Sequence, residues 1–549
     1  MSLMIDRRLL LKAGALGLGA LAVPGAAQLL AARGFTHNVA SGEPRARSVM
    51  LWTRYLPEAG GSGRISWQVS DSADFGRIVA DGVATASEEH DFCVKPVAEG
   101  LQPGRWYYFR FRDARGQFSP VGRTRTLPEG AVQSFRLGLF SCSNLGFGWF
   151  NAYAHAAARR DIDLMVHVGD YLYEYQRGRY PGAEETLPGR VLEPATEIVR
   201  LADYRLRFAA YRADPDLQRL HQYFPMVAMW DDHESANDSW ENGAQNHQPA
   251  TEGEWAERKG ASVRAYREWM PVSDDPYESY EIGDLATLFR PETRLTGRSR
   301  PGYLQAILRN QPDRQAALAA FRDGPWQDPA RTLMGPQQEA WLAEGLRRST
   351  GRGAKWQVIA QQVIMGTLAV PPEAANWLGP NATDGERAFL ANGLDAGRAG
   401  LPFNHDQWDG YPQARRRLLG AALEADANLV VLSGDSHNAW AFDLDLDGHR
   451  AGIELAGTSV TSPGHESEFT GVAPDAMVRA TVARNRQLKW ANLHQRGYAT
   501  LHLTPQRATA EWLFLRTIRE HTPTLAGRHV MTSARGSNRF GQATRAGGV

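Results

Sequence analysis

The sequence predicts an α/β protein in which a small β-rich domain precedes a larger layered core. Up to about residue 128, short strand-like runs are separated by turn residues, which is typical of a β-sandwich. After that point apolar strand-like runs alternate with helical stretches, as in an α/β domain. The chain has 549 residues, 43% of them hydrophobic and 22% charged, so its composition is that of an ordinary globular protein with more than one packed unit.

The first 32 residues have the three parts of an export signal. A charged start precedes an apolar middle (13–23) and then small residues, and Arg7 and Arg8 followed by leucines resemble the twin-arginine signal. A membrane anchor is the alternative, but the many Gly and Ala residues and Pro24 disfavour one. We therefore expect residues 1–32 to be a twin-arginine signal peptide. The twin-arginine export machinery would then be a partner, the protein would be periplasmic or extracellular, and it would have no stable membrane anchor.

Residues 35–128 are predicted to form the N-terminal β-sandwich. The spacing of Leu101, Pro103, Gly104 and Tyr107 matches the tyrosine corner of fibronectin-type domains, although a buried aromatic residue without that role is an alternative. The expected strands are 48–55, 65–70, 78–86, 92–97 and 105–113.

Residues 135–515 are predicted to form the α/β core, and 516–549 a C-terminal extension. Helical periodicity is clear at 336–349 and 412–427. The segment 176–200 and the tail are rich in Gly, Pro, Arg and Glu, which indicates long loops or covering elements.

The overall charge excludes some functions. Lys and Arg together number 61, as do Asp and Glu, so no net field draws the protein to nucleic acid or to anionic lipid. The two cysteines, Cys93 and Cys142, are too few for a disulfide framework, although one bridge between them is an alternative in an oxidising compartment.

Four apolar runs of the predicted core end in side chains that bind metals. Residues just past the carboxyl ends of strands converge in an open α/β sheet, so one site can hold all of them. Capping of loops or helices is the alternative for any one carboxylate. The four runs are 136–141 before Cys142, 164–169 before Asp170 and Tyr173, 226–230 before Asp231, Asp232 and His233, and 428–434 before Asp435 and His437.

These residues resemble a known family. GDYLY (169–173) is similar to the GDxxY element of calcineurin-like metallophosphoesterases, DDHE (231–234) stands where that superfamily has GNHE, and GDSH (434–437) is similar to GHxH with Asp replacing the first His. Together with FSCSN (140–144) and WDGYP (408–412), the chain resembles the PhoD-like alkaline phosphatase family. The resemblance implies a metallophosphoesterase-type layered sheet core with an N-terminal fibronectin-like β-sandwich domain.

The resemblance also implies ferric iron (Fe3+) and calcium (Ca2+) as cofactors. Cys142 and Tyr173 would bind the iron, and Asp170 would bridge it to a neighbouring ion. Free Tyr titrates near ~10, so a bound phenolate suits a strongly Lewis-acidic ion. A disulfide to Cys93 would remove the thiolate. The remaining expected ligands are Asp232, Asn237 and Asp435, which would give calcium its oxygen ligands, and His437, which would complete the cluster.

His233 and Asp170 are the expected catalytic residues. By resemblance, His233 contacts phosphate and protonates the leaving oxygen, whereas a hydrogen-bonded core histidine is the alternative. Asp231 would orient that ring or be structural. Arg294 would hold phosphate as a charged fork or, as the simpler expectation, form a surface salt bridge.

The predicted function is that of a secreted metal-dependent alkaline phosphatase and phosphodiesterase, in which metal-activated water or oxide attacks small phosphoesters. The nearest alternative is a phospholipase D-like phosphodiesterase that acts on lipid head groups or wall polymers. A non-catalytic metal or ligand binder is a second alternative. The aromatic residues of the β-sandwich also leave a carbohydrate-binding module open. We expect a monomer.

Overall fold

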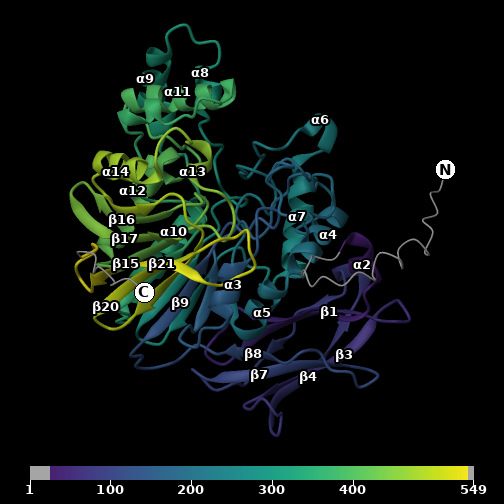
Figure 1. Ribbon diagram of the computed structural model, residues 1–549. Coiled ribbons are helices and arrows are strands. Elements are labelled where there is room, and N and C mark those ends of the chain that lie inside the picture. The colour runs from purple at the N-terminus through teal and green to yellow at the C-terminus, as the bar shows by residue number, and fades with distance from the viewer. Residues whose placement is uncertain (1–24, 542–549) are drawn as a thin grey trace, which may run out of the picture.

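The computed structural model describes residues 25–541 (Figure 1). Most of the predicted signal peptide, residues 1–24, therefore lies outside the described residues. The remainder of that segment contains the short helix α2 (Ala26–Ala31), whose Leu29 is buried. Within 25–541 no helix combines the length and the apolar character needed to cross a membrane.

Two large sheets form the centre of the molecule. The first runs in the order β21 (Leu525–Ala534), β20 (Arg507–Leu515), β19 (Gly497–Leu503), β9 (Phe135–Phe140), β10 (Leu164–His167), β11 (Pro225–Ala228), β1 (Gly34–Gly42), β2 (Val49–Leu56) and β5 (Cys93–Val94), and β6 (Val97–Ala98) also pairs with β2. The second runs in the order β12 (Glu278–Ile282), β13 (Ala286–Arg290), β14 (Trp356–Ala360), β15 (Leu429–Ser433), β17 (His449–Ala456), β16 (Ala439–Leu446) and β18 (Leu488–Asn492).

The two sheets pack face to face through a shared apolar core. Leu137 and Val166 of the first sheet lie in the same buried cluster as Val430 and Leu455 of the second. Their strands are almost continuously apolar because both faces of each sheet are covered. Strands β9, β10 and β11 are parallel neighbours, and β15 lies parallel between β14 and β17. The predicted layered α/β core is therefore confirmed, with two facing sheets.

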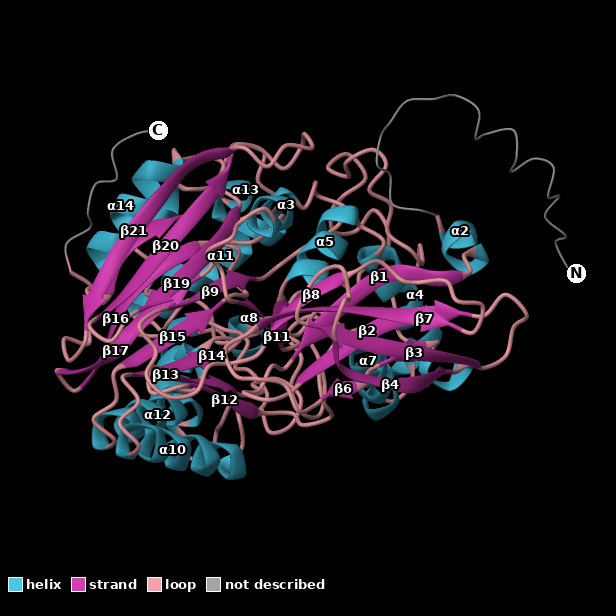
Figure 2. Cartoon of the chain, turned by 90° about the horizontal axis from the view of Figure 1, so that it is seen from below, coloured by secondary structure: helices cyan, strands magenta, loops and turns pink. Residues whose placement is uncertain are grey.

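Helices cover the outer faces of both sheets (Figure 2). The first sheet is covered by α3 (Asn151–Ala157), α4 (Leu201–Arg212), α5 (Pro215–Tyr223) and α7 (Trp255–Trp269), and the second by α10 (Pro336–Gly351) and α12 (Pro412–Glu424). Both α10 and α12 coincide closely with the helices predicted from periodicity, and Pro at the first position of each fits the start of a helix, where a backbone N–H is dispensable.

The N-terminal region is a β-sandwich that shares a sheet with the core. A sheet of β4 (Ile78–Ala86), β3 (Gly63–Ser70), β7 (Trp106–Asp113) and β8 (Gly122–Arg125) packs on β1 and β2. Because β1 pairs in parallel with β11, the second layer of the sandwich is an extension of the large core sheet. The tyrosine corner is present, since the Tyr107 hydroxyl accepts a hydrogen bond from the Gln102 N–H at 2.8 Å.

Three helices form a lobe above the sheets, which we call the helical cap (Figure 1). It consists of α8 (Leu304–Leu308), α9 (Arg314–Asp323) and α11 (Asp384–Arg398), which share a small apolar cluster around Leu318. Segment 176–200 is irregular, as predicted, whereas the tail supplies strand β21 to the edge of the first sheet. The other helices are α6 (Pro249–Glu252), α13 (His465–Glu468) and α14 (Pro474–Arg484).

Candidate metal centre and active site

The four predicted strand ends meet in one place. Cys142 follows β9, Asp170 follows β10, Asp232 follows β11, and Asp435 follows β15 of the facing sheet. The site therefore lies where carboxyl ends from both sheets converge, which is the position expected for a ligand site. Ligand atoms within 4.8 Å of one another occur in four overlapping groups: Cys142, Asp170 and His437; Asp170, Asp232 and His233; Asp231, Asp232 and Asp435; and Asp232, Asp238 and Asp406.

Backbone strain is concentrated at these residues. Cys142, Asp170, Asp435 and His437 all have positive φ angles, between 53° and 62°. Residues other than glycine rarely adopt this conformation, and such strain is characteristic of functional sites. Gly169 has φ of 105°, and a Cβ there would lie 2.3 Å from the Asp231 Cβ, so only glycine allows the turns after β10 and β11 to approach so closely.

One half of the site combines a thiol, a phenol and an imidazole around Asp170. The Tyr173 hydroxyl lies 3.1 Å from both Asp170 Oδ2 and His437 Nε2, and Ser462 Oγ donates to it at 2.7 Å. His437 Nδ1 lies 2.8 Å from the Pro463 carbonyl, so Nδ1 carries the proton and Nε2 keeps its lone pair for a ligand. Cys142 and Cys93 are both free thiols, so the alternative of a disulfide is wrong.

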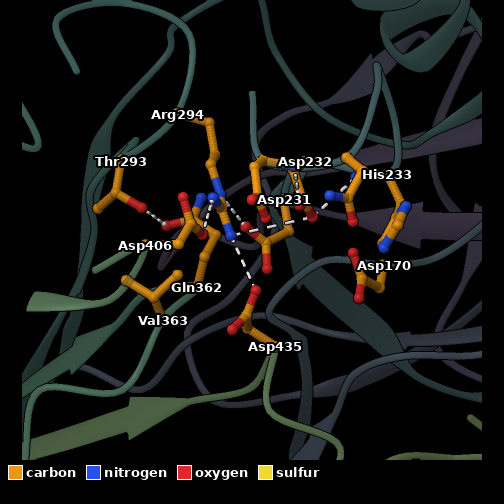
Figure 3. Close-up of polar contacts among 12 residues, drawn as sticks. Asp170, Asp231, Asp232, His233, Thr293, Arg294, Gln362, Val363, Asp406 and Asp435 are labelled. Carbon is orange, nitrogen blue, oxygen red and sulfur yellow. Dashed lines mark hydrogen bonds and ion pairs between the residues drawn. The ribbon is translucent and has the colours of Figure 1, made fainter. Parts of the chain in front are cut away.

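The other half is a set of carboxylates around one buried guanidinium (Figure 3). Arg294 is fully buried and forms ion pairs with Asp231, Asp406 and Asp435, and its Nη2 lies 3.9 Å from Asp232 Oδ1. The expectation of a surface salt bridge at Arg294 is therefore wrong. Arg294 follows strand β13 of the second sheet and reaches the site from that side. The sequence pattern PETR (291–294) does not reveal this position.

His233 is oriented by Glu174. The His233 Nδ1 lies 2.7 Å from Glu174 Oε2, and the Tyr173 ring packs on the imidazole with centroids 4.3 Å apart. Glu174 is buried and also accepts hydrogen bonds from the Asn237 N–H and the Asn246 amide. The proposed role of Asp231 in orienting this ring is wrong, because its carboxylate is paired with Arg294. Sequence reasoning missed Glu174, although it directly follows the GDxxY element.

The carboxylates around His233 favour its protonated form. Burial lowers its pKa, but Asp232, Glu174 and Asp170 outweigh burial and raise the His233 pKa well above its ordinary value. With Nδ1 donating to Glu174, Nε2 is the ring atom left to give a proton to a ligand.

The donor set fits bound cations. Asp170 Oδ1 and Asp231 Oδ2 are buried without a hydrogen-bond partner among the described residues. Burial, together with neighbouring carboxylates, raises the pKa of Asp170, Asp231 and Asp435 well above the usual range. Burial and Asp170 likewise raise the pKa of Cys142 and Tyr173. So many buried acidic groups ionise together only when a multivalent charge lies among them.

Asn237 and two unpredicted carboxylates line one border of the site. The Asn237 side-chain amide donates to Gln245 Oε1 at 3.1 Å, so its role as a calcium ligand stays a prediction. Asp238 and Asp406 group with Asp232, and neither was singled out in the sequence. Asp238 lies four residues after DDHE (231–234) and Asp406 two residues before WDGYP (408–412), so both are close in sequence to recognisable motifs.

Comparison with known proteins explains this arrangement. A family model described as "PhoD-like phosphatase" matches residues 137–512, and "PhoD-like phosphatase, N-terminal domain" matches residues 22–128. The chain belongs to the PhoD-like phosphatase family. It is 32% identical to alkaline phosphatase D of Bacillus subtilis over 503 residues, covering 87% of this chain and 77% of the relative. This PhoD-like chain is therefore a phosphoric ester hydrolase.

Solved structures agree with the PhoD-like assignment. A structure of PhoD superimposes with a TM-score of 0.75 and 28% identity, covering 94% of each chain. A purple acid phosphatase from yellow lupin (Lupinus luteus) seeds has a TM-score of 0.51 and 11% identity, covering 94% of this chain and 78% of the other. The second likeness shows the fold alone.

Proposed function

We propose that this PhoD-like phosphatase is a secreted, metal-dependent alkaline phosphatase and phosphodiesterase that hydrolyses small phosphoesters outside the cytoplasmic membrane. The observation that carries the proposal is the convergence of a thiol, a phenol, an imidazole and several carboxylates from separate strand ends on one buried site. Export by the twin-arginine route and a monomeric state belong to the same proposal. The pair Arg7 and Arg8 supports export. The equal numbers of acidic and basic residues support the absence of a nucleic acid partner.

The two halves of the site suit two kinds of ion. Cys142 and Tyr173, with Asp170 and the free lone pair of His437 Nε2, would hold ferric iron. Asp232, Asn237 and Asp435 would give calcium hard oxygen ligands. These ions, when bound, supply the Lewis acidity that activates water and neutralises the phosphoryl oxygens.

The protein's own groups have complementary tasks. The Arg294 guanidinium fixes the carboxylates at the base of the site, because all three of its nitrogens donate to Asp231, Asp406 and Asp435. His233, oriented by Glu174, donates a proton from Nε2 to the leaving oxygen. The Ser462 hydroxyl fixes the position of the Tyr173 hydroxyl by donating a hydrogen bond to it.

Rates and metal content test the proposal together. Hydrolysis of a monoester, a small diester and a phospholipid should be measured on protein whose iron and calcium are determined by elemental analysis, with an absorption scan for the phenolate-to-iron charge-transfer band. We expect both metals, the band, and turnover of the first two esters. Turnover of the phospholipid alone would favour the lipid phosphodiesterase. Absence of turnover on all three would contradict the proposal.

A further inference from the structure

A large pocket opens directly beside the carboxylate half of the site. Its cavity of about 990 Å³ lies between the segment after β11 and helices α8 and α11 of the helical cap. We call it the cap pocket and define it by Asp238, Trp240, Arg300, Tyr303, Phe403 and Asp406. Because Asp238 and Asp406 also group with Asp232, the cap pocket adjoins the metal-binding residues, and a molecule whose phosphate lies there has room to extend into it.

Partly exposed aromatic rings line this pocket. Among the described residues, neither Trp240 nor Tyr303 packs its ring on another aromatic side chain. Phe389 is 52% exposed at the pocket border and contacts Phe403 with ring centroids 4.9 Å apart. Exposed aromatic rings in a concave site are the usual partners of planar ligand groups.

The same pocket holds two arginine side chains, together with the carboxylates Asp238 and Asp406. Arg300 and Arg309 are exposed, and within 25–541 neither forms an ion pair. The Arg300 guanidinium lies 5.5 Å from the centre of the Trp240 ring. Amide side chains complete the lining, at Asn242, Asn392 and Asn404. The wall of the pocket therefore combines aromatic rings with guanidinium and amide groups, which can contact both the faces and the edges of a planar polar ring.

We propose that the cap pocket binds the nucleoside part of a nucleotide, with the base against Trp240 and Tyr303 and the phosphate at the metal-binding residues. The inference rests on the proposed function, because the phosphate must occupy that site. Amides and guanidinium groups recognise the edges of a base, whereas its faces stack on aromatic rings. A 990 Å³ cavity is large enough for a nucleoside.

The substrate preference of variants tests this assignment. The ratio of kcat/KM for AMP to that for glycerol 3-phosphate should exceed one in the wild-type protein. It should fall about 5- to 150-fold in Trp240→Ala, the range that loss of base stacking produces, and fall less in Arg300→Gln. Trp341→Ala is the matched control, since Trp341 is partly buried against Tyr277 and Phe289 on the outer face and should leave the ratio unchanged. An unchanged ratio in both pocket variants, or a preference for glucose 6-phosphate over AMP, would overturn the proposal.

Binding of adenosine distinguishes an error in the cap-pocket proposal from an error in the proposed function. It carries no phosphate, so calorimetric binding of adenosine to the wild-type protein reports on the pocket whether or not esters are hydrolysed. Binding that is lost in Trp240→Ala and kept in Trp341→Ala supports the cap pocket even if AMP and glycerol 3-phosphate are both inert. Hydrolysis of both esters without any adenosine binding would retain the proposed function and overturn the pocket.

Discussion

The two halves of the site differ in how the protein treats their acidic groups. In the carboxylate half, the buried Arg294 forms ion pairs with Asp231, Asp406 and Asp435, and Arg298 also pairs with Asp406. In the other half, no arginine or lysine of the described residues forms an ion pair with Cys142, Asp170 or Tyr173. The buried Arg496 nearby donates to the His437 and Ser462 carbonyls and pairs with Glu466 instead. The charge of the first half is therefore partly compensated before any ligand arrives. The second depends on a cation for the ionisation of its thiol and phenol.

This difference indicates two separate purposes. A buried guanidinium among carboxylates holds their oxygens in fixed positions. It also lets the protein stay folded when no metal is bound. A thiol and a phenol left neutral by burial make the other half selective for an ion that ionises both. Asp170 belongs to both halves, since it groups with Cys142 and His437 and also with Asp232 and His233.

The largest effect is expected where the halves meet. Asp170→Asn removes a charge from both, so kcat should fall on the order of 10⁴-fold or more. Elemental analysis should show loss of both metals. Asp161→Asn, at a half-exposed ion pair with Arg159, is the control and should change neither quantity. Retention of both metals in Asp170→Asn would refute its place in the two halves.

His233→Gln should lower kcat about 10³-fold for an alkyl phosphate, because the leaving alkoxide loses its proton donor. The loss should be much smaller for 4-nitrophenyl phosphate, whose nitrophenolate leaves without a proton. Steady-state rates on both esters check this. His449→Gln, at an exposed position on β17, should affect neither ester. Equal losses on the two esters would argue against proton donation.

Arg294→Met should destabilise the metal-depleted protein by about 3–5 kcal/mol, because Asp231 and Asp435 lose their ion-pair partner, whereas Asp406 keeps Arg298. Calcium should restore part of this stability by binding to those carboxylates. Urea unfolding with and without calcium measures both effects. Arg347→Met breaks an exposed pair with Glu344 and should cost below about 1 kcal/mol. A small effect of Arg294→Met would show that the guanidinium is dispensable in this half.

Cys142→Ser should weaken iron binding by more than the about 10- to 100-fold that loss of a residue supporting a metal ligand costs, since a hydroxyl replaces a thiolate ligand while Tyr173 remains. Iron content should fall more than calcium content, and the charge-transfer band should weaken. Cys93→Ser changes the other buried thiol and should leave the metal content and the band intact. If iron and calcium fell equally, the two halves would not be separate sites.

Much of the site could be predicted because its residues are adjacent in sequence to recognisable strands. An apolar run followed by Asp170 or Asp435 identifies a strand end from local information alone, and the end of a parallel strand has a known place in an α/β fold. The tyrosine corner at Tyr107 was equally local, since the hydrogen bond spans five residues.

The partners of those residues could not be predicted in the same way. The sequence separates Arg294 from Asp231, Asp406 and Asp435 by 63, 112 and 141 positions, and no local pattern pairs a guanidinium with carboxylates so far away. Glu174 lies 59 positions from His233, and only the packing of the β10 and β11 turns brings the two together. The pairing of β1 with β11 also joined the sandwich to the core sheet, which periodicity within either segment does not reveal.

The sequence by itself determined which side chains lie at the ends of the strands, because hydrophobic periodicity and turn chemistry act over a few residues. Tertiary structure alone decided which charges face one another, because that depends on how distant segments pack. The ionisation of each group, the burial of Arg294 and the aromatic pocket beside Asp406 all follow from that packing.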